Sequence, residues 1–247
     1  YFPHVAPAEK SLLWKDGYAR FEDHFRGPES DIESRQKKYI KAFKKHYNVL
    51  DIGCGRGEFL ELLKKNNIEA TGIDLDPQMV AKCKGKGLSA FHADALDYLS
   101  KTKNNQLGGI MVSHVVEHLS LSYLTQLLEA CFRKLKDGGL LVIETPNPLC
   151  MYTAAINFSR DLTHKQIMHP DTLRFLLSEI GFVDFEVKSS APFPKTDKLK
   201  NLKEEKGISS EQTENIKILN ENIERLNSLI FGEQDYSITA QKPTNAN

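Results

Sequence analysis

Hydrophobic and polar positions along the chain switch between two spacings. Short apolar runs that end at polar residues or glycine predict buried strands, and these runs are "NVLDIG", "EATGIDLD", "LSAFHAD", "GGIMVSH" and "LLVIETPN". Apolar residues three or four positions apart predict helices, and these lie at about 31–46, 58–66, 77–86 and 122–135, the last closed by "KDGG". Strands that alternate with helices need crossover connections, so the pattern predicts a mostly parallel sheet with helices on both faces.

The C-terminal part adds a helix in "HPDTLRFLLSEIGF" and two strands, "VDFEVKSS" and "DYSITAQK". Between these strands lies an insert, Lys195–Gly232, that is rich in Lys, Glu and Asn. It carries a stripe of apolar residues at spacings of three and four: Ile216, Leu219, Ile223, Leu226 and Ile230. A stripe of about two heptads does not decide between a helix that packs on its own domain and a homodimer contact through residues 216–230.

We therefore expect a single domain over residues 1–247. Its parts are a helical lead-in (1–47), a core (48–194), the helical insert (195–232) and a final strand (233–243).

The amino-acid composition of the chain limits the classes of partner that it is expected to bind. The chain has 247 residues, with 33 Lys+Arg and 33 Asp+Glu, so its net charge is zero. A neutral chain argues against a nucleic-acid partner, because phosphates favour clustered positive charge. The basic run "KKYIKAFKKH" is interpreted as the solvated face of a helix. The four cysteines, at positions 54, 83, 131 and 150, form no C-x-x-C pair, and no apolar run is long enough to span a membrane. These features favour reduced thiols and a cytoplasmic protein.

The turn "DIGCGRG" follows the first predicted strand and carries Gly53, Gly55 and Gly57. Glycine permits positive φ and leaves bare backbone that a ligand can approach closely. A dinucleotide-binding turn, G-x-G-x-x-G, would place its third glycine where this chain has Glu58. A carboxylate there would repel a pyrophosphate, so the turn favours a nucleoside ligand without phosphates.

Two acids follow later strands. Asp74 ends the second strand, where an acid accepts hydrogen bonds from ribose hydroxyls in nucleoside-binding folds. Asp94 closes the third strand, where a carboxylate can face an adenine amino group. The alternative is that both acids are ordinary turn residues at strand ends.

The series "VLDIGCGRGEFLELL…ATGIDLDPQMV…ADALDYL…VVEHL…LKDGGLLVIETPNP" resembles the class I S-adenosylmethionine-dependent methyltransferases. The resemblance implies a Rossmann-like, seven-stranded sheet whose last strand is inserted antiparallel, and S-adenosylmethionine as cofactor. It also implies the cofactor-binding residues: Asp51, Gly53, Cys54 and Gly55 for the methionine part, Asp74 for the ribose, and Leu75, Asp94 and Ala95 around the adenine. One departure is Gly108–Gly109, where many relatives carry an acid before the fourth strand.

Two clusters of acids and histidines follow the fourth and fifth strands, where an acceptor would bind in this fold. The first, "HVVEHL", holds His114, Glu117 and His118, which would share one face if a helix began there. The second, "DLTHKQIMHPDTL", holds three residues: Asp161, His164 and His169.

Similar arrangements occur in the metal-dependent O-methyltransferases of ubiquinone biosynthesis and of small-RNA 2′-O-methylation. By this likeness His114, Glu117, His118 and His169 are candidate ligands of a divalent metal. A general base without metal is the rival hypothesis, with His164, His114 and Asp161 as candidate catalytic residues. A third alternative is that "VVEH" only begins the helix and organises the cofactor pocket.

The block "D-x-TH…HP-x-TLRFLL…GF" resembles bacterial methyltransferases encoded with polysaccharide and O-antigen assembly. That resemblance implies O-methylation of a sugar hydroxyl on a bacterial glycan. The alternatives are a small-molecule or quinone-type acceptor, or a scaffold that binds the cofactor without catalysis. Arg20 and Arg26 in the lead-in are further candidates to bind the cofactor carboxylate or an acidic acceptor.

Overall fold

The computed structural model describes residues 27–203, 207 and 209–244, and these form one seven-stranded sheet in the order β3-β2-β1-β4-β5-β7-β6. The sheet is mostly parallel and has helices on both sides, which confirms the predicted fold class. The contacts within the chain divide it into two compact units, Tyr1–Asp94 and Ala95–Asn247.

The first unit holds three parallel strands in the order β3-β2-β1. Its strands are β1 (Val49–Ile52), β2 (Ala70–Asp74) and β3 (Ala90–His92), and its helices are α3 (Glu29–Phe43), α4 (Glu58–Lys65) and α5 (Pro77–Gly85). All four residues of β1 are buried. Helix α3 packs on α4, where the rings of Phe43 and Phe59 meet edge to face at 5.5 Å.

Glycines in the first unit set the spacing between α4 and α5. Gly57, the residue before α4, has a left-handed φ of 86°. A Cβ there would lie 2.7 Å from Leu88 Cδ1 and 2.8 Å from Cys83 Sγ. Gly57 is therefore required both by its backbone conformation and by its closeness to buried neighbours.

Replacing Gly57 with alanine is expected to lower the free energy of unfolding by about 2–5 kcal/mol. Left-handed backbone costs a non-glycine residue about 1–2 kcal/mol, and overpacking a core costs about 1–3 kcal/mol. Urea denaturation followed by circular dichroism measures the loss. Gly85→Ala is the matched control, because a Cβ at Gly85 meets nothing within 4 Å. Equal effects of the two substitutions would contradict this explanation.

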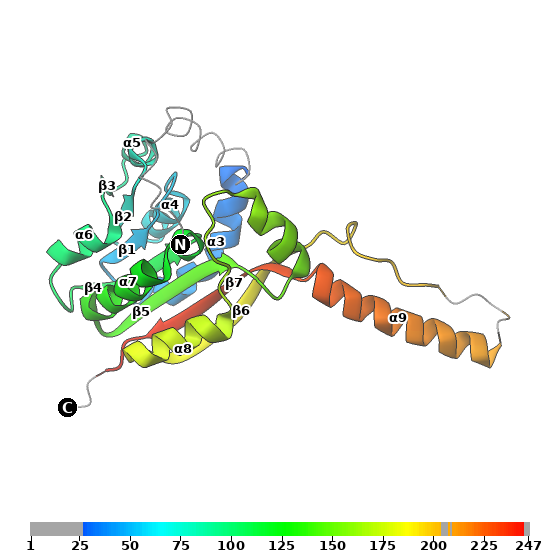
Figure 1. The fold of residues 1–247 in the computed structure, drawn as a ribbon. Coiled ribbons are helices and arrows are strands. Elements are labelled where there is room, and N and C mark those ends of the chain that lie inside the picture. The colour runs from blue at the N-terminus through cyan, green and yellow to red at the C-terminus, as the bar shows by residue number, and fades with distance from the viewer. Residues whose placement is uncertain (1–26, 204–206, 208, 245–247) are drawn as a thin grey trace, which may run out of the picture. The chain divides into compact units, whose positions relative to one another are not determined.

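The second unit holds parallel strands β4 and β5 and antiparallel strand β7, which pairs with both β5 and β6 (Figure 1). Its strands are β4 (Leu107–Ser113), β5 (Leu135–Pro146), β6 (Val183–Pro192) and β7 (Glu233–Gln241). Its longer helices are α6 (Ala95–Lys101), α7 (Leu121–Lys134), α8 (Pro170–Ile180) and α9 (Ser210–Ile230). Three short helical turns complete it: η1 (Val116–His118), the π-helix η2 (Thr153–Asn157) and η3 (Phe158–Arg160).

Two predictions about local structure were wrong. Helix α6 was not expected, because it is only seven residues long and buries only Leu99. Helix α7 was expected to close at the glycines of "KDGG", but it ends at Lys134 and the chain enters β5 at Leu135. Gly138 and Gly139 instead lie within β5, near a register shift between Leu107 and Gly109 of β4. Gly138 has a φ of 71° and donates from its N–H to Lys242 O at 2.9 Å.

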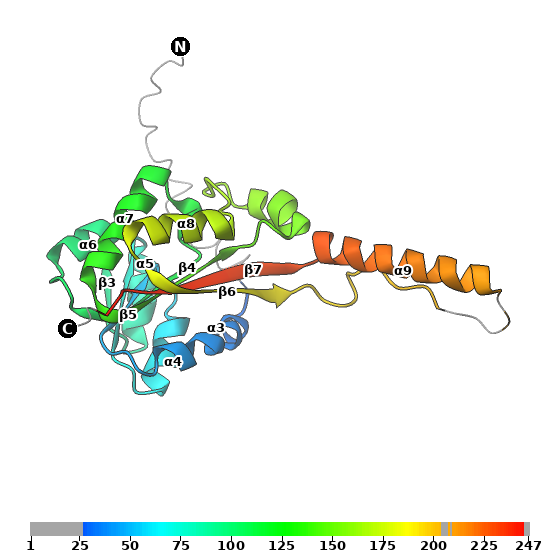
Figure 2. The ribbon, with the colours of Figure 1, turned by 90° about the horizontal axis from the view of Figure 1, so that it is seen from below.

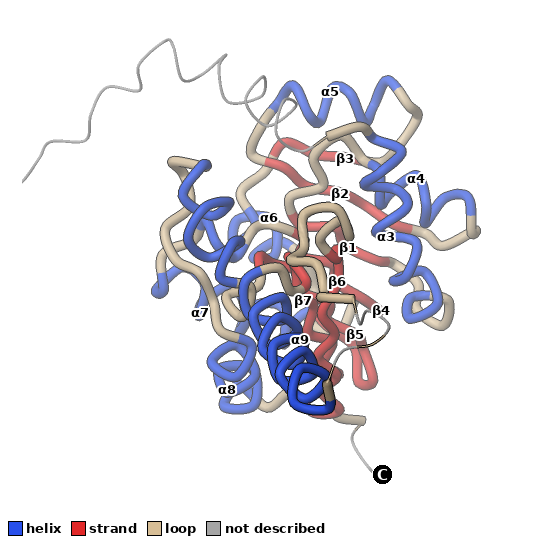
Figure 3. Tube along the Cα trace, turned by 90° about the vertical axis from the view of Figure 1, so that its right-hand side faces the viewer, coloured by secondary structure: helices blue, strands red, loops and turns tan. Residues whose placement is uncertain are grey.

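Helix α9 begins at a capping box formed by Ser209 and Gln212 and leads back toward β7 (Figures 2 and 3). Its Asn227 side chain both accepts from the N–H and donates to the carbonyl of Leu199, at 2.8 and 2.9 Å. Asn220 makes the same two bonds with Leu202. The insert is thus a helix with an extended segment bonded along one face. Among the described residues, no helix is long and apolar enough to cross a membrane.

Candidate active site

The glycine turn after β1 is held against the end of β2. Gly53, Gly55 and Gly57 all have positive φ, at 72°, 52° and 86°. The N–H groups of Gly53 and Cys54 both donate to Ile73 O, at 2.8 and 3.1 Å. The turn therefore has the conformation that its glycines predicted, with its backbone fixed in place.

Asp74 ties this turn to the segment after β2. One carboxylate oxygen accepts from Gly55 N at 2.8 Å, and the other accepts from Asp76 N at 2.8 Å. A carboxylate oxygen can accept more than one hydrogen bond, so a carboxylate that holds the loop can also be an acceptor for ribose hydroxyls. Asp74 thus stabilises the loop through these two hydrogen bonds, and it is also the acid expected beside a ribose.

Glu58 does not present an isolated charge to the turn. Its Oε1 lies 2.7 Å from Arg56 Nε in a pair that is almost fully buried. The Arg56 guanidinium also donates to Gly27 O at 3.1 Å. Since Arg56 neutralises the carboxylate, repulsion by Glu58 is not a sufficient reason to exclude a pyrophosphate. The choice of cofactor rests instead on the comparisons below.

Of the other predicted cofactor residues, Asp51 and Cys54 lie just before and within the glycine turn, and Asp94 and Ala95 lie after β3. Asp51 is buried in β1, and Cys54 is 3% exposed. A hydrogen bond with Cys83 and burial both raise the pKa of the Cys54 thiol, which is therefore a neutral core group. Only the backbone of Cys54 is suited to a ligand. Asp94 comes two residues after β3, and Ala95 is the first residue of α6.

Leu75 is 68% exposed directly after β2, and its carbonyl lies 3.1 Å from His92 Nε2. An exposed leucine at this place suits an adenine ring, which would cover it. Leu75→Ala is expected to weaken cofactor binding about 10-fold, because covering a leucine contributes about 1.5–3 kcal/mol. Calorimetric titration checks this, with Leu121→Ala, 57% exposed on α7, as control. An unchanged dissociation constant would contradict the assignment.

The first acceptor cluster is built on η1 rather than on a longer helix. His114 precedes η1 with a left-handed φ of 53°, so the expectation of one shared helical face was wrong. The contact itself is present, since His114 Nδ1 lies 3.2 Å from Glu117 Oε1. Glu117 is 1% exposed, and its Oε2 accepts from Thr145 Oγ1 at 2.9 Å.

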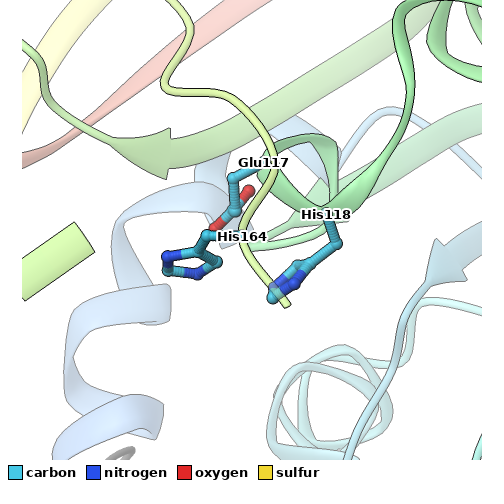
Figure 4. Close-up of side chains that lie close together, drawn as sticks. All are labelled: Glu117, His118 and His164. Atoms are coloured by element: carbon cyan, nitrogen blue, oxygen red, sulfur yellow. The ribbon is translucent and has the colours of Figure 1, made fainter. Parts of the chain in front are cut away.

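The second cluster approaches the first within the second unit (Figure 4). The backbone carbonyl of Glu117 accepts from Lys165 N at 2.8 Å, which fixes the segment that carries His164. The rings of His118 and His164 lie 4.7 Å apart, and Phe158 stacks on His164 at 4.5 Å. Glu117, His118 and His164 each offer one ligand atom, and these atoms all lie within 4.8 Å of one another.

Charge is unevenly distributed in this cluster. Desolvation disfavours the charged form of His114, but Asp235, Glu117 and Glu144 outweigh it and raise its pKa to about 9. Burial opposes ionisation of Glu117, yet the hydrogen bond and charge of His114 lower its pKa overall. Burial lowers the pKa of His118. Near neutral pH, His114 and Glu117 therefore form an ion pair beside a neutral His118.

Two predicted residues have other contacts. His169 caps α8, where its Nδ1 accepts from Asp171 N at 3.2 Å, and it does not join the group of Glu117, His118 and His164. Asp161 lies beside that group, with its Oδ2 3.9 Å from His164 Nε2. The structure thus brings His164, rather than His169, to the candidate metal ligands. Arg20 and Arg26 lie outside the described residues.

Two threonines of the site were not predicted. Thr145 bonds Glu117, and Thr163 bonds both His118 Nδ1 and Asp161 Oδ1, at 2.8 and 2.7 Å. Thr163 stands between two predicted residues in "DLTH", so its position next to His164 was the available signal. Thr145 lies near the end of β5, and the end of this strand was expected at the acceptor site.

A Rossmann-like sheet with a glycine turn after β1 and an acid at the end of β2 is the arrangement of enzymes that bind a nucleoside-containing cofactor. Residues 12–187 match a family model described as a methyltransferase domain. Because the match covers more than half of the chain, this protein belongs to that family, as an S-adenosylmethionine-dependent methyltransferase.

Solved structures of methyltransferases are similar to this chain. A SAM-dependent methyltransferase from Archaeoglobus fulgidus is 43% identical, with a TM-score of 0.85 over 92% of this chain and 100% of that chain. Phosphoethanolamine N-methyltransferase 2 from Haemonchus contortus, solved with S-adenosylhomocysteine, has a TM-score of 0.65 over 99% of this chain and 62% of that chain. It is 15% identical, so it supports the fold alone.

Curated relatives are matched over shorter segments. A ubiquinone biosynthesis O-methyltransferase from Xanthomonas oryzae pv. oryzae is 29% identical over 104 residues, which is 40% of this chain and 43% of the relative. The enzyme of the same name from Nitrosococcus oceani is 31% identical over 127 residues, 49% of this chain and 53% of the relative. The chain thus matches about half or less of the length of these relatives.

Proposed function

We propose that this methyltransferase transfers the methyl group to a hydroxyl oxygen, and that Glu117, His118 and His164 serve the acceptor. The carrying observation is that one ligand atom of each lies within 4.8 Å of the others, on a buried carboxylate and two imidazoles. A hydroxyl is a weak nucleophile at neutral pH. It needs a base that accepts its proton, or a metal that would lower its pKa so that water can accept the proton. The oxygen then attacks the methyl carbon, and the carbon–sulfur bond breaks.

For the methyl donor, we propose residues of the glycine turn and of the segments that follow β2 and β3. Backbone groups of Gly53, Cys54 and Gly55, with Asp51, would hold the methionine part. Asp74 would bind the ribose, with Leu75, Asp94 and Ala95 at the adenine. Bound S-adenosylmethionine would supply a sulfonium methyl group, and the fixed turn limits its freedom before transfer. The positive φ of three alternate glycines supports this fit.

Two ways of activating the hydroxyl remain as proposals, and the geometry favours a divalent metal at Glu117, His118 and His164. Imidazole and carboxylate ligands suit zinc, manganese or cobalt better than magnesium, which prefers oxygen. A bound metal would lower the pKa of the hydroxyl. His114, with a pKa of about 9, is already protonated near neutral pH, which disfavours it as a base. His164, close to Asp161, is the better candidate for a base without metal.

For the acceptor, we favour a phenolic hydroxyl of the kind implied by the names of the curated relatives. The segment that leads to His164 exposes large apolar side chains that suit an aromatic or prenylated acceptor: Leu149, Met151, Ile156 and Leu162. A sugar hydroxyl on a bacterial glycan is the second candidate and rests on the resemblance of the "D-x-TH…HP-x-TL" block. Four buried, unpaired cysteines support a reducing, cytoplasmic setting.

The test is transfer of labelled methyl from S-adenosylmethionine to a panel of catechols, sugars and amines. The assay is run as prepared, after EDTA, and after EDTA followed by manganese. Methylation of a catechol, lost with EDTA and restored by manganese, supports the phenol and the metal. Methylation of sugars alone would favour the glycan. Activity that EDTA leaves unchanged would support His164 as base, and methylation of amines alone would overturn the proposal.

We also propose that α9 carries a homodimer contact. Leu219 and Leu226, one heptad apart, are 49% and 44% exposed, whereas the extended segment at Leu199–Leu202 bonds another face of the helix. Sedimentation of the Leu219→Glu, Leu226→Glu double variant is expected to give monomer mass where the wild type gives dimer mass. Ser228→Glu is the control, since it adds a carboxylate to a polar face. A monomeric wild type at all concentrations would refute the contact.

A further inference from the structure

The hydrogen-bond partners of the site histidines determine which ring nitrogen carries the proton. Thr163 Oγ1 donates to Asp161 Oδ1 at 2.7 Å and lies 2.8 Å from His118 Nδ1. A hydroxyl has one proton to donate. Since that proton goes to the Asp161 carboxylate, the Thr163 oxygen must accept from His118, and His118 Nδ1 must carry a proton.

His164 is fixed in the same way by a different partner. Its Nδ1 lies 2.8 Å from the backbone carbonyl of Phe158, which can only accept. His164 Nδ1 therefore also carries the proton. In the neutral form of each ring, the nitrogen left with a lone pair is Nε2.

We infer that Thr163 is a positioning residue: with Asp161, it holds His118 in the Nδ1–H tautomer, so that Nε2 is available to a metal or to the acceptor proton. The inference rests on the proposed function, in which the Nε2 lone pair of His118 binds a metal or accepts the proton of the acceptor hydroxyl. Its chemistry is general, since a partner on the second nitrogen sets the tautomer and orientation of a ligating imidazole.

The inference predicts a difference between two substitutions at one position. Thr163→Ser keeps the hydroxyl and should keep the tautomer. Thr163→Val keeps the shape but removes the acceptor, so His118 is expected to populate both tautomers. Nitrogen NMR of histidine-labelled protein without metal or cofactor reads the tautomer directly. Thr125→Val on α7 controls for the general effect of the same substitution.

Metal affinity provides the second readout. Cobalt(II), titrated into the protein and followed by its visible absorbance, is expected to bind Thr163→Val about 10–100-fold more weakly than the wild type, the usual cost of losing such a partner. Thr163→Ser should restore binding. If Val does not fold, Asp161→Ala replaces it, because Thr163 can then turn its proton toward His118.

The outcomes separate the two ideas. The role of Thr163 is supported if His118 carries its proton on Nδ1 in the wild type and in Thr163→Ser, but not in Thr163→Val. An Nε2–H tautomer in wild type, or an unchanged tautomer in Val, overturns it. Wild type that shows the expected tautomer but binds no cobalt would contradict the metal part of the proposed function and leave the positioning of His118 supported.

Discussion

Glu117→Gln is expected to lower kcat about 100-fold or more, the range seen when a metal site loses its carboxylate or proton transfer loses its partner. The carboxylate is 1% exposed and holds His114 through one oxygen and Thr145 through the other. Glutamine preserves the shape but removes the charge that pairs with His114 and attracts a cation. Steady-state kinetics with the accepted phenol or sugar measures the loss.

The control for this substitution is Glu129→Gln, an exposed glutamate on α7 that lies outside the cluster. The affinity of Glu117→Gln for S-adenosylmethionine is expected to stay near the wild-type value, because none of the proposed donor residues belongs to this cluster. A Glu117→Gln enzyme with wild-type kcat, or one that fails only in donor binding, would show that the cluster does not serve the acceptor.

Asp74→Ala is expected to weaken S-adenosylmethionine binding about 100-fold or more. The carboxylate accepts from Gly55 N and from Asp76 N, both at 2.8 Å, and is proposed to bind the ribose as well. Hydrogen bonds to a charged group contribute about 1.5–3 kcal/mol each, and removal of the carboxylate also frees the turn. Calorimetric titration with the donor measures the change.

A neighbouring acid separates loop stability from ligand binding. Asp76 caps α5 by accepting from Gln78 N at 2.7 Å. Asp76→Ala should therefore cost about 1 kcal/mol of stability, as the loss of a helix cap does, with little change in donor affinity. Equal affinities of Asp74→Ala and wild type would refute the ribose assignment.

The sequence predicted the helices and strands whose buried residues form a recognisable pattern of apolar positions. Strands β1 and β4, whose residues are all buried, appear in the sequence as short segments of mostly apolar residues. The glycine turn could also be predicted from the sequence, since the positive φ values at Gly53 and Gly55 favour glycine. Helix α6 was missed because it is short and buries only Leu99. The end of α7 was assigned to glycines that belong to a strand irregularity.

The candidate acceptor site was predicted only in part, because tertiary contacts decide it. The sequence placed His114, Glu117 and His118 near each other, but a left-handed residue at His114 rather than helical spacing brings the first two into contact. His164 and His169 could not be ranked by spacing. The choice depends on the bond from Lys165 N to the Glu117 carbonyl, and on the capping role of His169.

We propose that this chain methylates a hydroxyl oxygen at the cluster of Glu117, His118 and His164. The most direct test is carbon NMR of the product formed from carbon-13 methyl-labelled S-adenosylmethionine, with wild type and His164→Ala compared at equal donor occupancy. We expect an O-methyl resonance with wild type and its loss or near loss with His164→Ala. A label on nitrogen or carbon, or full O-methylation by His164→Ala, would contradict it.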